Sequence, residues 1–452
     1  MFNKQDSLLV VHEPGMGKTL TAIACAECYL DQHPMSNVVV ITMVSLLGNF
    51  DKEFKKYGGI DANRYIFISY ETFLSEHKKS KKKSCDIFKD ALLIIDEVHE
   101  LRNYESSVFE AIMDCIRVSR KVLLLTATPY VNGCCDFISI INLLYKKYVI
   151  APATTSAEKL AQYAVYRASN KIKGCSKRSD WWKPAPPPET LLRQFRPFLE
   201  DKVSFATKGA DNVNYPREEI NTILIPMNPE YEKEFLDIVP VSAKDDPFYG
   251  LRRQKVNAID RLAYSDKLKN PQVLAMIQNP ENKNVIFSSW LEHGVEFIED
   301  VLAELGIEYR VISGDVTARD RTQIVKDFNE DNVRNLIITT AGMAGIDLVG
   351  VTNIIVVDPV WNDGNLRQII GRGVRYRSHS HLPVAKRVVH VYLLKLVEKR
   401  FAGKEGDIYK PENIDDINRR SRSGDIILYK IIERKRAENE LVLKMLQEIS
   451  VV

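Results

Sequence analysis

The sequence predicts an α/β protein with two doubly wound parallel sheets, one in each of two lobes. Two series of short apolar, β-branched runs alternate with segments of helical period, one before residue 150 and one after residue 220. Strands and helices that alternate at this spacing indicate crossover units and therefore parallel sheets. The length of 452 residues agrees, since it exceeds that of one ordinary domain.

The domain boundaries are expected to follow these two series. The first lobe is expected at 1–150 and the second at 221–400. Residues 151–220 are expected to form an insertion or linker, because WWKPAPPPE at 181–189 has too many prolines for an ordinary helix or a central strand. Residues 401–452 are expected to form a helical tail with clustered basic residues.

Continuous apolar runs are typical of strands that are buried on both faces. The first series also contains a helical segment at 106–118 and a basic run, KKSKKK at 78–83, which is expected to be an exposed loop. In the second series the helical segments are LEHGVEFIEDVLAEL and RDRTQIVKDFN. The expected strands are LLVV at 8–11, the run at 38–44, YIFIS, ALLII and KVLLLT, then NTILIPM, NVIFSSW, YRVISG, NLIITT, NIIVVDP and VVHVYLL.

The composition describes a globular protein with ample apolar residues, since 45% are hydrophobic and the mean hydropathy is −0.20. The 63 basic and 60 acidic residues leave a net charge of +3, so any basic surface for nucleic acid must be local. Seven cysteines, an odd number scattered along the chain, favour reduced thiols in an intracellular protein. No apolar run has the length of a membrane span, and the first stretch is not typical of a signal peptide.

Residues 12–19, HEPGMGKT, have the composition of a phosphate-binding loop. They follow an apolar run and precede a segment of helical period, which is the strand–turn–helix context that such a loop requires. Gly15 and Gly17 would let several backbone N–H groups turn toward one anion at a helix N-terminus. Lys18 would reach the β- and γ-phosphates, and the Thr19 hydroxyl would bind Mg²⁺.

The loop departs from its consensus at the first position, where His12 stands in place of glycine. A Gly-rich turn with a chance GKT is therefore the alternative interpretation. The chemistry of the other motifs has to separate the two.

Asp96 and Glu97 directly follow the expected strand LLII, in the sequence DEVH. Ligands of doubly wound sheets bind at the carboxyl ends of the strands, which is where these carboxylates fall. Asp96 would hold Mg²⁺ through water, and Glu97 would orient and polarise the attacking water. An acidic pair could also be a solvated turn, but its position downstream of a phosphate-binding loop favours a hydrolytic site.

Other polar and glycine residues follow later strands. Thr126 and Thr128, in TATP, would couple the nucleotide site to a facing domain, although TATP alone is a weak signal. The second series contains Gly342, Gly345 and Asp347 before the sequence QIIGRGVR.

In QIIGRGVR, Arg372 and Arg375 are three positions apart. If the segment is helical, both lie on one face and would point into one interface. Phosphoryl transfer spreads negative charge over equatorial oxygens, which arginines supplied across a cleft stabilise. Either arginine alone could belong to a surface helix, but their spacing beside Gln368 and Gly371 favours a site.

The motifs GMGKT, DEVH, TATP, TTAGMAGIDL and QIIGRGVR resemble those of superfamily 2 helicase-like ATPases in order and spacing. VVVITMVSLLGNFDKEF, ISYETF, DEVHELRN, TATPYVN, NVIFSSW and VDPVWN are similar to the SWI/SNF-type branch. RQIIGRGVRYRSHSHLP resembles more closely still the nucleoside triphosphatase I and early transcription factor ATPases of poxviruses and related large DNA viruses. The resemblance extends over residues 8–395.

The resemblance implies two RecA-like lobes with ATP and Mg²⁺ between them and nucleic acid across both. The residues implied to bind the cofactor are Gly15, Gly17, Lys18, Thr19, Asp96, Gly345 and Asp347, with Thr19 and Asp96 on the metal. The implied catalytic residues are Glu97, Gln368, Arg372 and Arg375. Those implied to lie near nucleic acid or on the coupling path are Ser45, Leu46, Thr126, Thr128, Thr339, Thr340 and Gly342.

The family's upstream segment, with its adenine-reading glutamine, is missing from this chain. The sequence starts barely one strand before the phosphate-binding loop, and Gln5 lies too close to that loop to replace the glutamine. We therefore expect either a truncated chain or weak recognition of the base.

Two functions from different classes remain open. The first is an ATPase motor that translocates on nucleic acid, with duplex DNA favoured over RNA. The intervals between the motifs of lobe two are short and contain no clear strand-separating wedge, which favours translocation over helicase activity. The second is a transcription-complex subunit that binds DNA and partners such as a viral RNA polymerase or transcription factors, with hydrolysis secondary. Intact Lys18, Glu97 and Arg375 favour the first. Either protein would be intracellular, in the virion or host-cell cytoplasm if viral, and would not involve a membrane.

Overall fold

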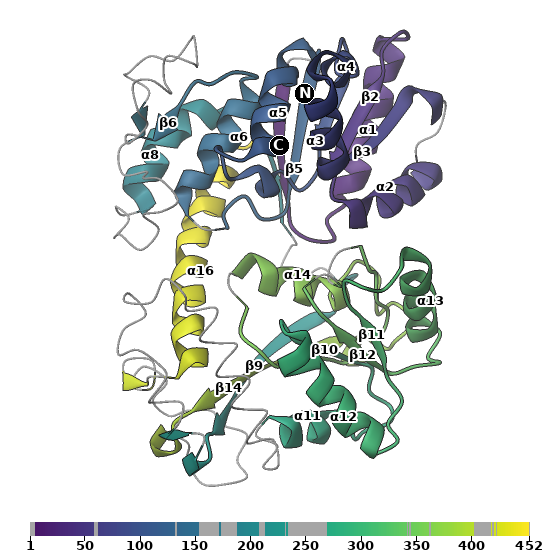
Figure 1. Cartoon of the computed structure of the whole chain (residues 1–452), viewed down its shortest axis with the longest axis vertical. Helices are drawn as coiled ribbons and strands as arrows, with labels where there is room; N and C mark the ends of the chain where they lie inside the picture. The colour runs from purple at the N-terminus through teal and green to yellow at the C-terminus, as the bar shows by residue number, and fades with distance from the viewer. Residues whose placement is uncertain are drawn as a thin grey trace. The chain divides into compact units, whose positions relative to one another are not determined.

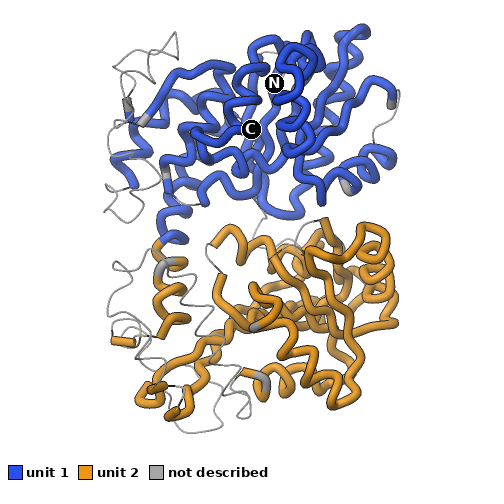
Figure 2. Tube along the Cα trace, in the orientation of Figure 1, with its two compact units in different colours: residues 1–210, 435–452 blue, residues 211–434 orange. Residues whose placement is uncertain are grey.

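The computed structural model describes residues 5–57, 62–131, 133–152, 171–172, 188–207, 213–230, 232–233, 269–340, 342, 345–360, 363–401, 417, 420–421 and 423–451. The proline-rich stretch with Trp181 and Trp182 lies outside these residues. The chain divides into two compact units (Figure 2). The first unit comprises 1–210 and 435–452, and the second comprises 211–434.

The first unit is built on a six-stranded sheet in which every pairing is parallel. All residues of its strands β1, β2 and β4 are buried, as expected for apolar runs covered on both faces. The strand order is β3-β2-β4-β5-β1-β8. The strands are β1 (Ser7–His12), β2 (Val38–Thr42), β3 (Tyr65–Ser69), β4 (Leu92–Ile95), β5 (Lys121–Thr126) and β8 (Val203–Ala206).

Helices cover both faces of this sheet (Figure 1). On one face α1 (Lys18–Gln32) and α2 (Val44–Tyr57) pack against alternate strand residues such as Leu8 and Val10. Leu9, the residue between them, packs with the helices of the other face. Those helices are α3 (Tyr70–Lys79), α4 (Lys81–Asp86), α5 (Ser107–Cys115), α6 (Phe137–Leu144) and α8 (Pro188–Leu199). Short segments complete the unit: η1 (Ala62–Arg64), η2 (Val98–Leu101), η3 (Ile116–Val118), η4 (Cys134–Asp136), and a pair of two-residue strands, β6 (Ala151–Pro152) and β7 (Lys171–Ile172).

The basic run at 78–83 is helical, so its prediction as a loop is wrong, although its lysines are exposed. Ser80 ends α3 and its side chain also caps the start of α4, accepting from the Lys83 backbone N–H. Lysine has a straight side chain that loses little rotamer freedom in a helix, so a serine cap suffices to start one here.

The first unit extends beyond the expected boundary at residue 150. In α8, four apolar side chains at helical spacing enter its core, among them Phe195 and Leu199. After α8, β8 adds to the sheet by pairing with β1, with Leu9 opposite Val203. These contacts place 188–206 within the first unit instead of in a separate linker.

The second unit has its own six-stranded parallel sheet, in the order β11-β12-β10-β13-β14-β9. Its two longest strands, β9 (Arg217–Pro226) and β14 (Val388–Val397), lie side by side in Figure 1 and pair along their whole length. The other strands are β10 (Asn284–Phe287), β11 (Arg310–Ile312), β12 (Asn335–Ile338) and β13 (Asn353–Val356). The helices are α11 (Asn270–Ile277), α12 (Glu296–Glu304) after a π-helical turn at Leu291–Val295, α13 (Ala318–Asn329), α14 (Asp363–Gly373), the short η11 (Val384–Lys386) and η12 (Lys399–Phe401), and α16 (Gly424–Glu448).

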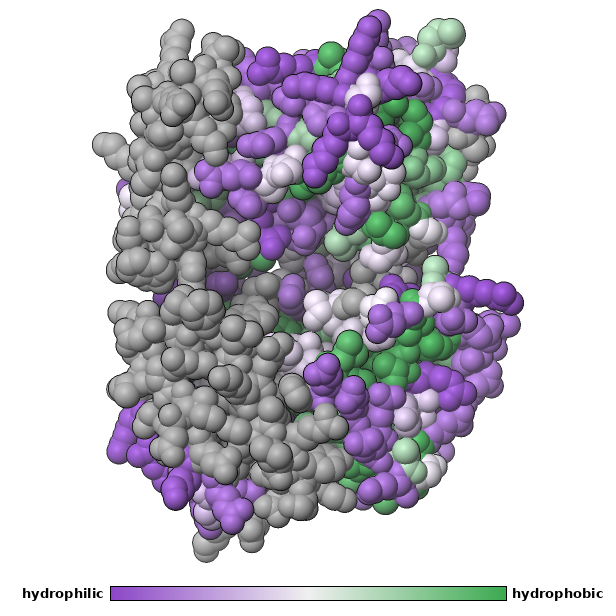
Figure 3. Space-filling view, in the orientation of Figure 1, coloured by the Kyte–Doolittle hydropathy of each residue, from purple (hydrophilic) through white to green (hydrophobic). Residues whose placement is uncertain are grey.

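The fold class and the helical C-terminal segment are confirmed: each unit holds a parallel sheet with its own apolar clusters, and the chain ends in α16. The last turns of α16 pack into the core of the first unit through side chains such as Val442 and Leu446. Within the described residues, no helix is long and apolar enough to cross a bilayer. Among the residues that Figure 3 colours, hydrophobic and hydrophilic ones are interspersed.

The expectation that the thiols are reduced is contradicted, because Cys85, Cys115 and Cys135 are all disulfide-bonded. Cys85 of α4 and Cys115 of α5 form a disulfide, whereas Cys25 and Cys28 are free. The two bonded residues are 30 positions apart and meet only because α4 and α5 pack against each other, so their spacing carried no signal.

Candidate nucleotide site

The loop between β1 and α1 has the backbone that a phosphate-binding loop requires. Gly15 and Gly17 adopt φ of 81° and 74°, in the left-handed region that glycine tolerates best. Gly17 is the N-cap of α1 and supplies no side-chain cap, so the first N–H groups of the helix are not satisfied by it. Lys18 and Thr19 are the first two residues of α1, which places both side chains at its positive end.

His12, the departure from the consensus, is the last residue of β1 and precedes the turn. Its side chain is buried, and its Nε2 lies 3.5 Å from Ser204 Oγ on β8. Burial lowers the pKa of His12, and the charge of Lys18 acts in the same direction. A histidine is tolerated there because the positive φ angles of this loop begin only at Gly15.

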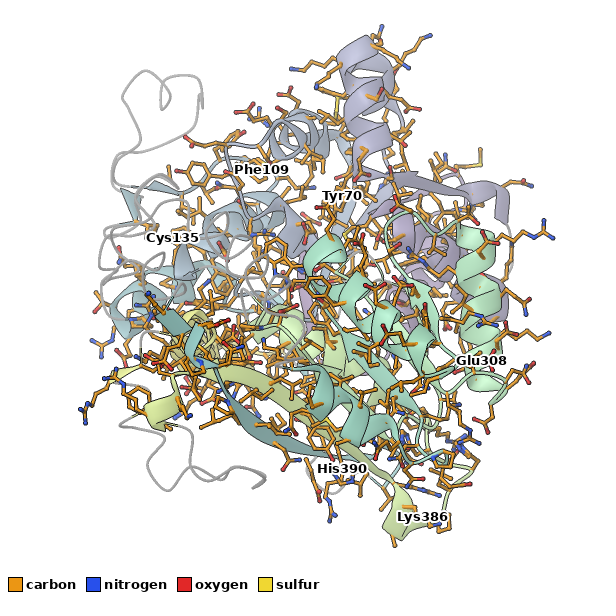
Figure 4. All side chains as sticks on the ribbon, turned by 60° about the horizontal axis from the view of Figure 1, so that its bottom comes forward. Tyr70, Phe109, Cys135, Glu308, Lys386 and His390 are labelled. Atoms are coloured by element: carbon orange, nitrogen blue, oxygen red, sulfur yellow. A yellow bond between two sulfur atoms is a disulfide. The ribbon has the colours of Figure 1, made fainter. Side chains whose placement is uncertain are left out.

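Lys18 joins the loop to the acidic motif at the end of β4. Its Nζ lies 2.6 Å from Glu97 Oε1 and 3.7 Å from Asp96 Oδ1. Thr42, at the end of β2, donates its hydroxyl to Asp96 Oδ2 at 3.2 Å. Tyr70, labelled in Figure 4, donates its hydroxyl to the Asp96 carbonyl at 2.7 Å. The carboxyl ends of β2 and β4 and the start of α1 therefore converge on one acidic pair.

The two carboxylates have different electrostatic environments. Burial alone would raise the pKa of Glu97, but the Lys18 ammonium and the contact with His99 hold it well below its usual range. Burial raises the pKa of Asp96, and Lys18 only partly opposes this. Glu97 is therefore held ionised beside Lys18, as a residue that orients and polarises water must be.

Glu97 also has a strained backbone. Its φ of 51° lies in the left-handed region, which costs a residue other than glycine about 1–3 kcal/mol. This conformation turns the chain sharply from β4 into η2.

The oxygen atoms at this position fit a hard divalent cation. Asp96 Oδ1 is buried and has no hydrogen-bond partner within the described residues. The hydroxyl of Thr19 and a carboxylate oxygen are the ligand types that Mg²⁺ prefers. Thr19 and Asp96 are thus the residues of the first unit that would hold Mg²⁺.

His99 connects the acidic pair to the end of β5. Its Nδ1 lies 3.3 Å from Glu97 Oε2, 3.0 Å from Thr126 Oγ1 and 3.3 Å from Thr128 Oγ1, while Nε2 lies 3.4 Å from Glu100. Burial alone would lower the pKa of His99, but Glu100 and Glu97 raise it to about 9. The imidazolium therefore lies among two carboxylates and two hydroxyls.

His99, Thr42 and Tyr70 belong to this group of contacts, although no motif in the sequence predicts a role for them. The histidine of DEVH was the available signal, because a histidine three residues after a strand-end aspartate lies within reach of the next strand. Thr42 and Tyr70 had no such signal, since their contacts depend on the pairing of β2 with β4 and on the packing of α3.

In the second unit, the predicted arginines lie close to a single loop segment. Arg372, near the end of α14, donates from Nη1 to the Ile346 carbonyl at 3.3 Å. The Arg375 guanidinium forms an ion pair with Asp347. Because α14 ends at Gly373, Arg375 does not share a helical face with Arg372 as the helical interpretation required. Both nevertheless contact the segment that follows Gly345, whose φ is 74°.

The remaining predicted residues lie on strand ends and helix starts. Thr339 is buried after β12, Thr340 is exposed, and Gly342 donates its N–H to the Thr339 carbonyl at 2.9 Å. A Cβ at Gly342 would come within 2.2 Å of the Ile312 carbonyl oxygen, so the backbone requires glycine there. Ser45 and Leu46 occupy the first turn of α2, and Gln368 is half-buried on α14.

Known families match this chain in two segments. A family model described as Type III restriction enzyme, res subunit, matches residues 1–131, and one described as helicase conserved C-terminal domain matches 267–377. A protein of Acanthamoeba polyphaga mimivirus whose name describes an ATP-dependent RNA helicase is 27% identical, with 85% of this chain and 84% of that protein covered. Nucleoside triphosphatase I of Heliothis armigera entomopoxvirus is 22% identical, with 99% of this chain and 76% of that protein covered.

The chain is a helicase-like ATPase of superfamily 2. The predicted family and the predicted ATP hydrolase class are thereby confirmed. A solved structure of the Sulfolobus solfataricus SWI2/SNF2 ATPase core in complex with dsDNA is 18% identical, covers 100% of this chain and 94% of its own, and aligns with a TM-score of 0.35. In this superfamily 2 ATPase, the res-subunit match contains the phosphate-binding loop and DEVH, and the C-terminal match contains Gln368, Arg372 and Arg375.

Proposed function

We propose that this ATPase is a nucleic-acid-dependent motor that couples ATP hydrolysis to translocation along duplex DNA, in the context of transcription. The observation that carries the proposal is the contact path from Lys18 through Glu97 and His99 to Thr126. The path joins phosphate-binding and water-activating groups to the end of β5. A motor requires such a connection, because the state of the nucleotide has to alter distant parts of the chain.

The residues of the first unit divide the chemistry as follows. The backbone N–H groups at Gly15 and Gly17 and the Lys18 ammonium bind the phosphates. Thr19 and Asp96 hold Mg²⁺, which when bound neutralises charge on the phosphate oxygens. Glu97 accepts a hydrogen bond from the attacking water and aligns it with the terminal phosphate.

Lys18 changes its partner when the phosphates bind. Its ammonium lies against Glu97 and Asp96, so contact with a phosphate frees Glu97 Oε1 for the water. The ion pair is nearly buried, which keeps Glu97 ionised until that exchange occurs. Hydrolysis is thereby linked to the presence of nucleotide.

Arg372 and Arg375 supply positive charge to the phosphates from the second unit, in the role that the family resemblance gives them. Arg375 is engaged by the carboxylate of Asp347, so the step exchanges one anionic partner for another. Charge placed on a transferring phosphoryl group acts mainly on the transition state. Gln368 lies on the same helix as Arg372 and completes this group.

Nucleic acid is the partner that the relatives' names support. Besides the mimivirus protein, whose name describes an RNA helicase, a chromodomain-helicase-DNA-binding protein of Homo sapiens is 24% identical over 80% of this chain and 15% of its own length. Ser45, Leu46, Thr339, Thr340 and Gly342 would contact the backbone of the nucleic acid or transmit its binding. Viral RNA polymerase or transcription factors are the protein partners proposed from the family resemblance of the sequence. Nucleoside triphosphatase I relatives occur in several entomopoxviruses.

Two assays separate translocation from strand separation. The first measures displacement of a third strand from a DNA triplex, and the second measures displacement of one strand from a tailed duplex. We expect ATP-dependent triplex displacement by the wild type and none by Glu97→Gln, which keeps the shape but loses the charge. Efficient opening of the tailed duplex without triplex displacement would instead support a helicase. DNA binding without either activity, and with negligible turnover, would support the transcription-complex subunit.

A further inference from the structure

One helical layer of the first unit contains a cluster of one histidine and two cysteines that the nucleotide chemistry does not use. His77 lies in the last turn of α3, Cys85 in α4 and Cys115 at the end of α5. One ring nitrogen of His77 and the two Sγ atoms all lie within 4.8 Å of one another. His77 Nδ1 is 3.6 Å from Cys115 Sγ. The two sulfur atoms are joined as a disulfide.

The imidazole of His77 is oriented from its other side. Asp114 Oδ2 lies 3.3 Å from His77 Nε2, and the ammonium of Lys81 holds the same oxygen at 2.7 Å. The ring of Phe73 stacks on the imidazole with 6.0 Å between centroids. A proton on Nε2, donated to Asp114, directs the Nδ1 lone pair toward the sulfurs. Histidines that bind metal ions almost always donate their other N–H to a carboxylate, carbonyl or water in this way.

We propose that His77, Cys85 and Cys115 bind one Zn²⁺ ion when the two cysteines are reduced. Two thiolates and one imidazole nitrogen are a ligand set typical of zinc, with a water in the fourth position. Cys85 and His77 are only half-buried, so an ion and its water reach the cluster from solvent. Ser84 Oγ lies 2.9 Å from both His77 Nδ1 and the Lys81 carbonyl, and it has one proton for the two acceptors. When the ion takes the Nδ1 lone pair, the hydroxyl donates that proton to the Lys81 carbonyl.

The disulfide and the zinc site exclude each other, because the same two sulfurs form both. A dithiol reductant transfers two electrons and two protons to the Sγ–Sγ bond, which breaks into two thiols while the dithiol becomes a disulfide. Zn²⁺ binding then releases both thiol protons to solvent, and each thiolate donates an electron pair to the ion. The disulfide in the oxidised chain and the zinc ion in the reduced chain each connect α4 to the end of α5. The two helices are therefore held together in both redox states.

The test uses the full chain, reduced with a dithiol that is then removed by anaerobic gel filtration. Zinc per chain is measured after dialysis against Zn²⁺, and Co²⁺ is added in parallel as a spectroscopic probe. We expect one zinc per reduced chain above the content of the oxidised chain. With Co²⁺ we expect a thiolate-to-metal charge-transfer band together with the ligand-field bands of a tetrahedral site.

Variants assign this ion to the cluster. Cys85→Ser, Cys115→Ser and His77→Gln are each expected to lose the zinc and the Co²⁺ bands. Asp114→Asn leaves all three ligands in place and is expected to weaken Zn²⁺ affinity by about 10–100-fold. Cys28→Ser, at an exposed free thiol of α1, is the matched control and is expected to keep the ion.

Two results would overturn the proposal. The first is a chain in which Cys85 and Cys115 are shown to be reduced but which binds no zinc and gives no Co²⁺ bands. The two cysteines would then serve as a disulfide alone. The second is unchanged zinc in Cys85→Ser and Cys115→Ser, since the ion would then lie elsewhere. Asp114→Asn tests the orienting role of the carboxylate without removing a zinc ligand. Full Zn²⁺ affinity in that folded variant would contradict this role.

Discussion

Lys18→Ala removes the ammonium that pairs with both acidic residues of DEVH. Lys18 Nζ lies 2.6 Å from Glu97 Oε1 and 3.7 Å from Asp96 Oδ1. The side chains are nearly buried, with exposed fractions of 14% for Lys18, 17% for Glu97 and 7% for Asp96. Removing one preorganised group that stabilises transition-state charge typically costs about 2.7–4 kcal/mol, or 10²–10³-fold in turnover. We therefore expect hydrolysis by Lys18→Ala to fall by at least about 10²-fold while the protein remains folded.

The same substitution leaves two neighbouring carboxylates without this cation. Stripping a buried charge of its partner costs about 3–5 kcal/mol, and water entry reduces this, so we expect about 1–3 kcal/mol less unfolding free energy at pH 7. Because the folded pKa of Glu97 is lowered, its contribution is present above the unfolded value of about 4.3 and is lost as pH falls toward the folded value. The stability difference between the two proteins should therefore shrink below about pH 4.

Single-turnover hydrolysis of labelled ATP measures the first effect, and urea unfolding as a function of pH measures the second. Lys55→Ala is the matched control, because Lys55 Nζ lies 2.7 Å from Asp51 with both side chains exposed, at 70% and 40%. Such a surface pair contributes about 0–1 kcal/mol, so the control should retain stability and activity. Hydrolysis by folded Lys18→Ala within about twofold of the wild type would remove Lys18 from the nucleotide site.

Three further predictions concern other groups. Arg375→Ala should lower turnover far more than nucleotide affinity, because it acts on the transition state; a collapse of binding with normal turnover of bound nucleotide would contradict this. ATP and GTP should be hydrolysed at similar rates, since the phosphates and Mg²⁺ dominate recognition, and a strong preference for ATP would reveal a residue that reads the base. The stabilisation from His99 should be complete below its unfolded pKa of about 6.5 and be lost as pH rises through its folded pKa of about 9. The unfolding free energies of wild type and His99→Gln should therefore converge above pH 9. A constant difference between them from pH 6 to 10 would exclude that pKa shift.

Much of the fold followed from local patterns in the sequence. The predicted strands at 38–44, ALLII and KVLLLT contain parallel strands that end at Thr42, Ile95 and Thr126, because an apolar run covered on both faces has few alternatives. The strand end also located the acidic pair, since Asp96 and Glu97 had to fall at the carboxyl edge of the sheet.

Features that depend on packing between distant segments could not be predicted in the same way. β8 joins the first sheet through pairing with β1, which lies almost 200 residues earlier. The contacts of Tyr70 and Thr42 with Asp96 depend on which strands become neighbours. Arg375 lies beyond α14 because the helix ends at Gly373, so its pairing with Asp347 did not follow from helical spacing.

Nucleic acid is proposed to control ATP hydrolysis by this chain. The most direct test is steady-state ATP turnover with single-stranded and duplex DNA and RNA of several sequences, at about 50 and 200 mM salt, with Glu97→Gln as the inactive control. Phosphate contacts are sequence-independent and weaken as salt rises. We predict that duplex DNA of any sequence stimulates turnover, less so at the higher salt, and that Glu97→Gln shows no stimulation. Turnover that no nucleic acid changes at either salt concentration would show that nucleic acid does not control hydrolysis.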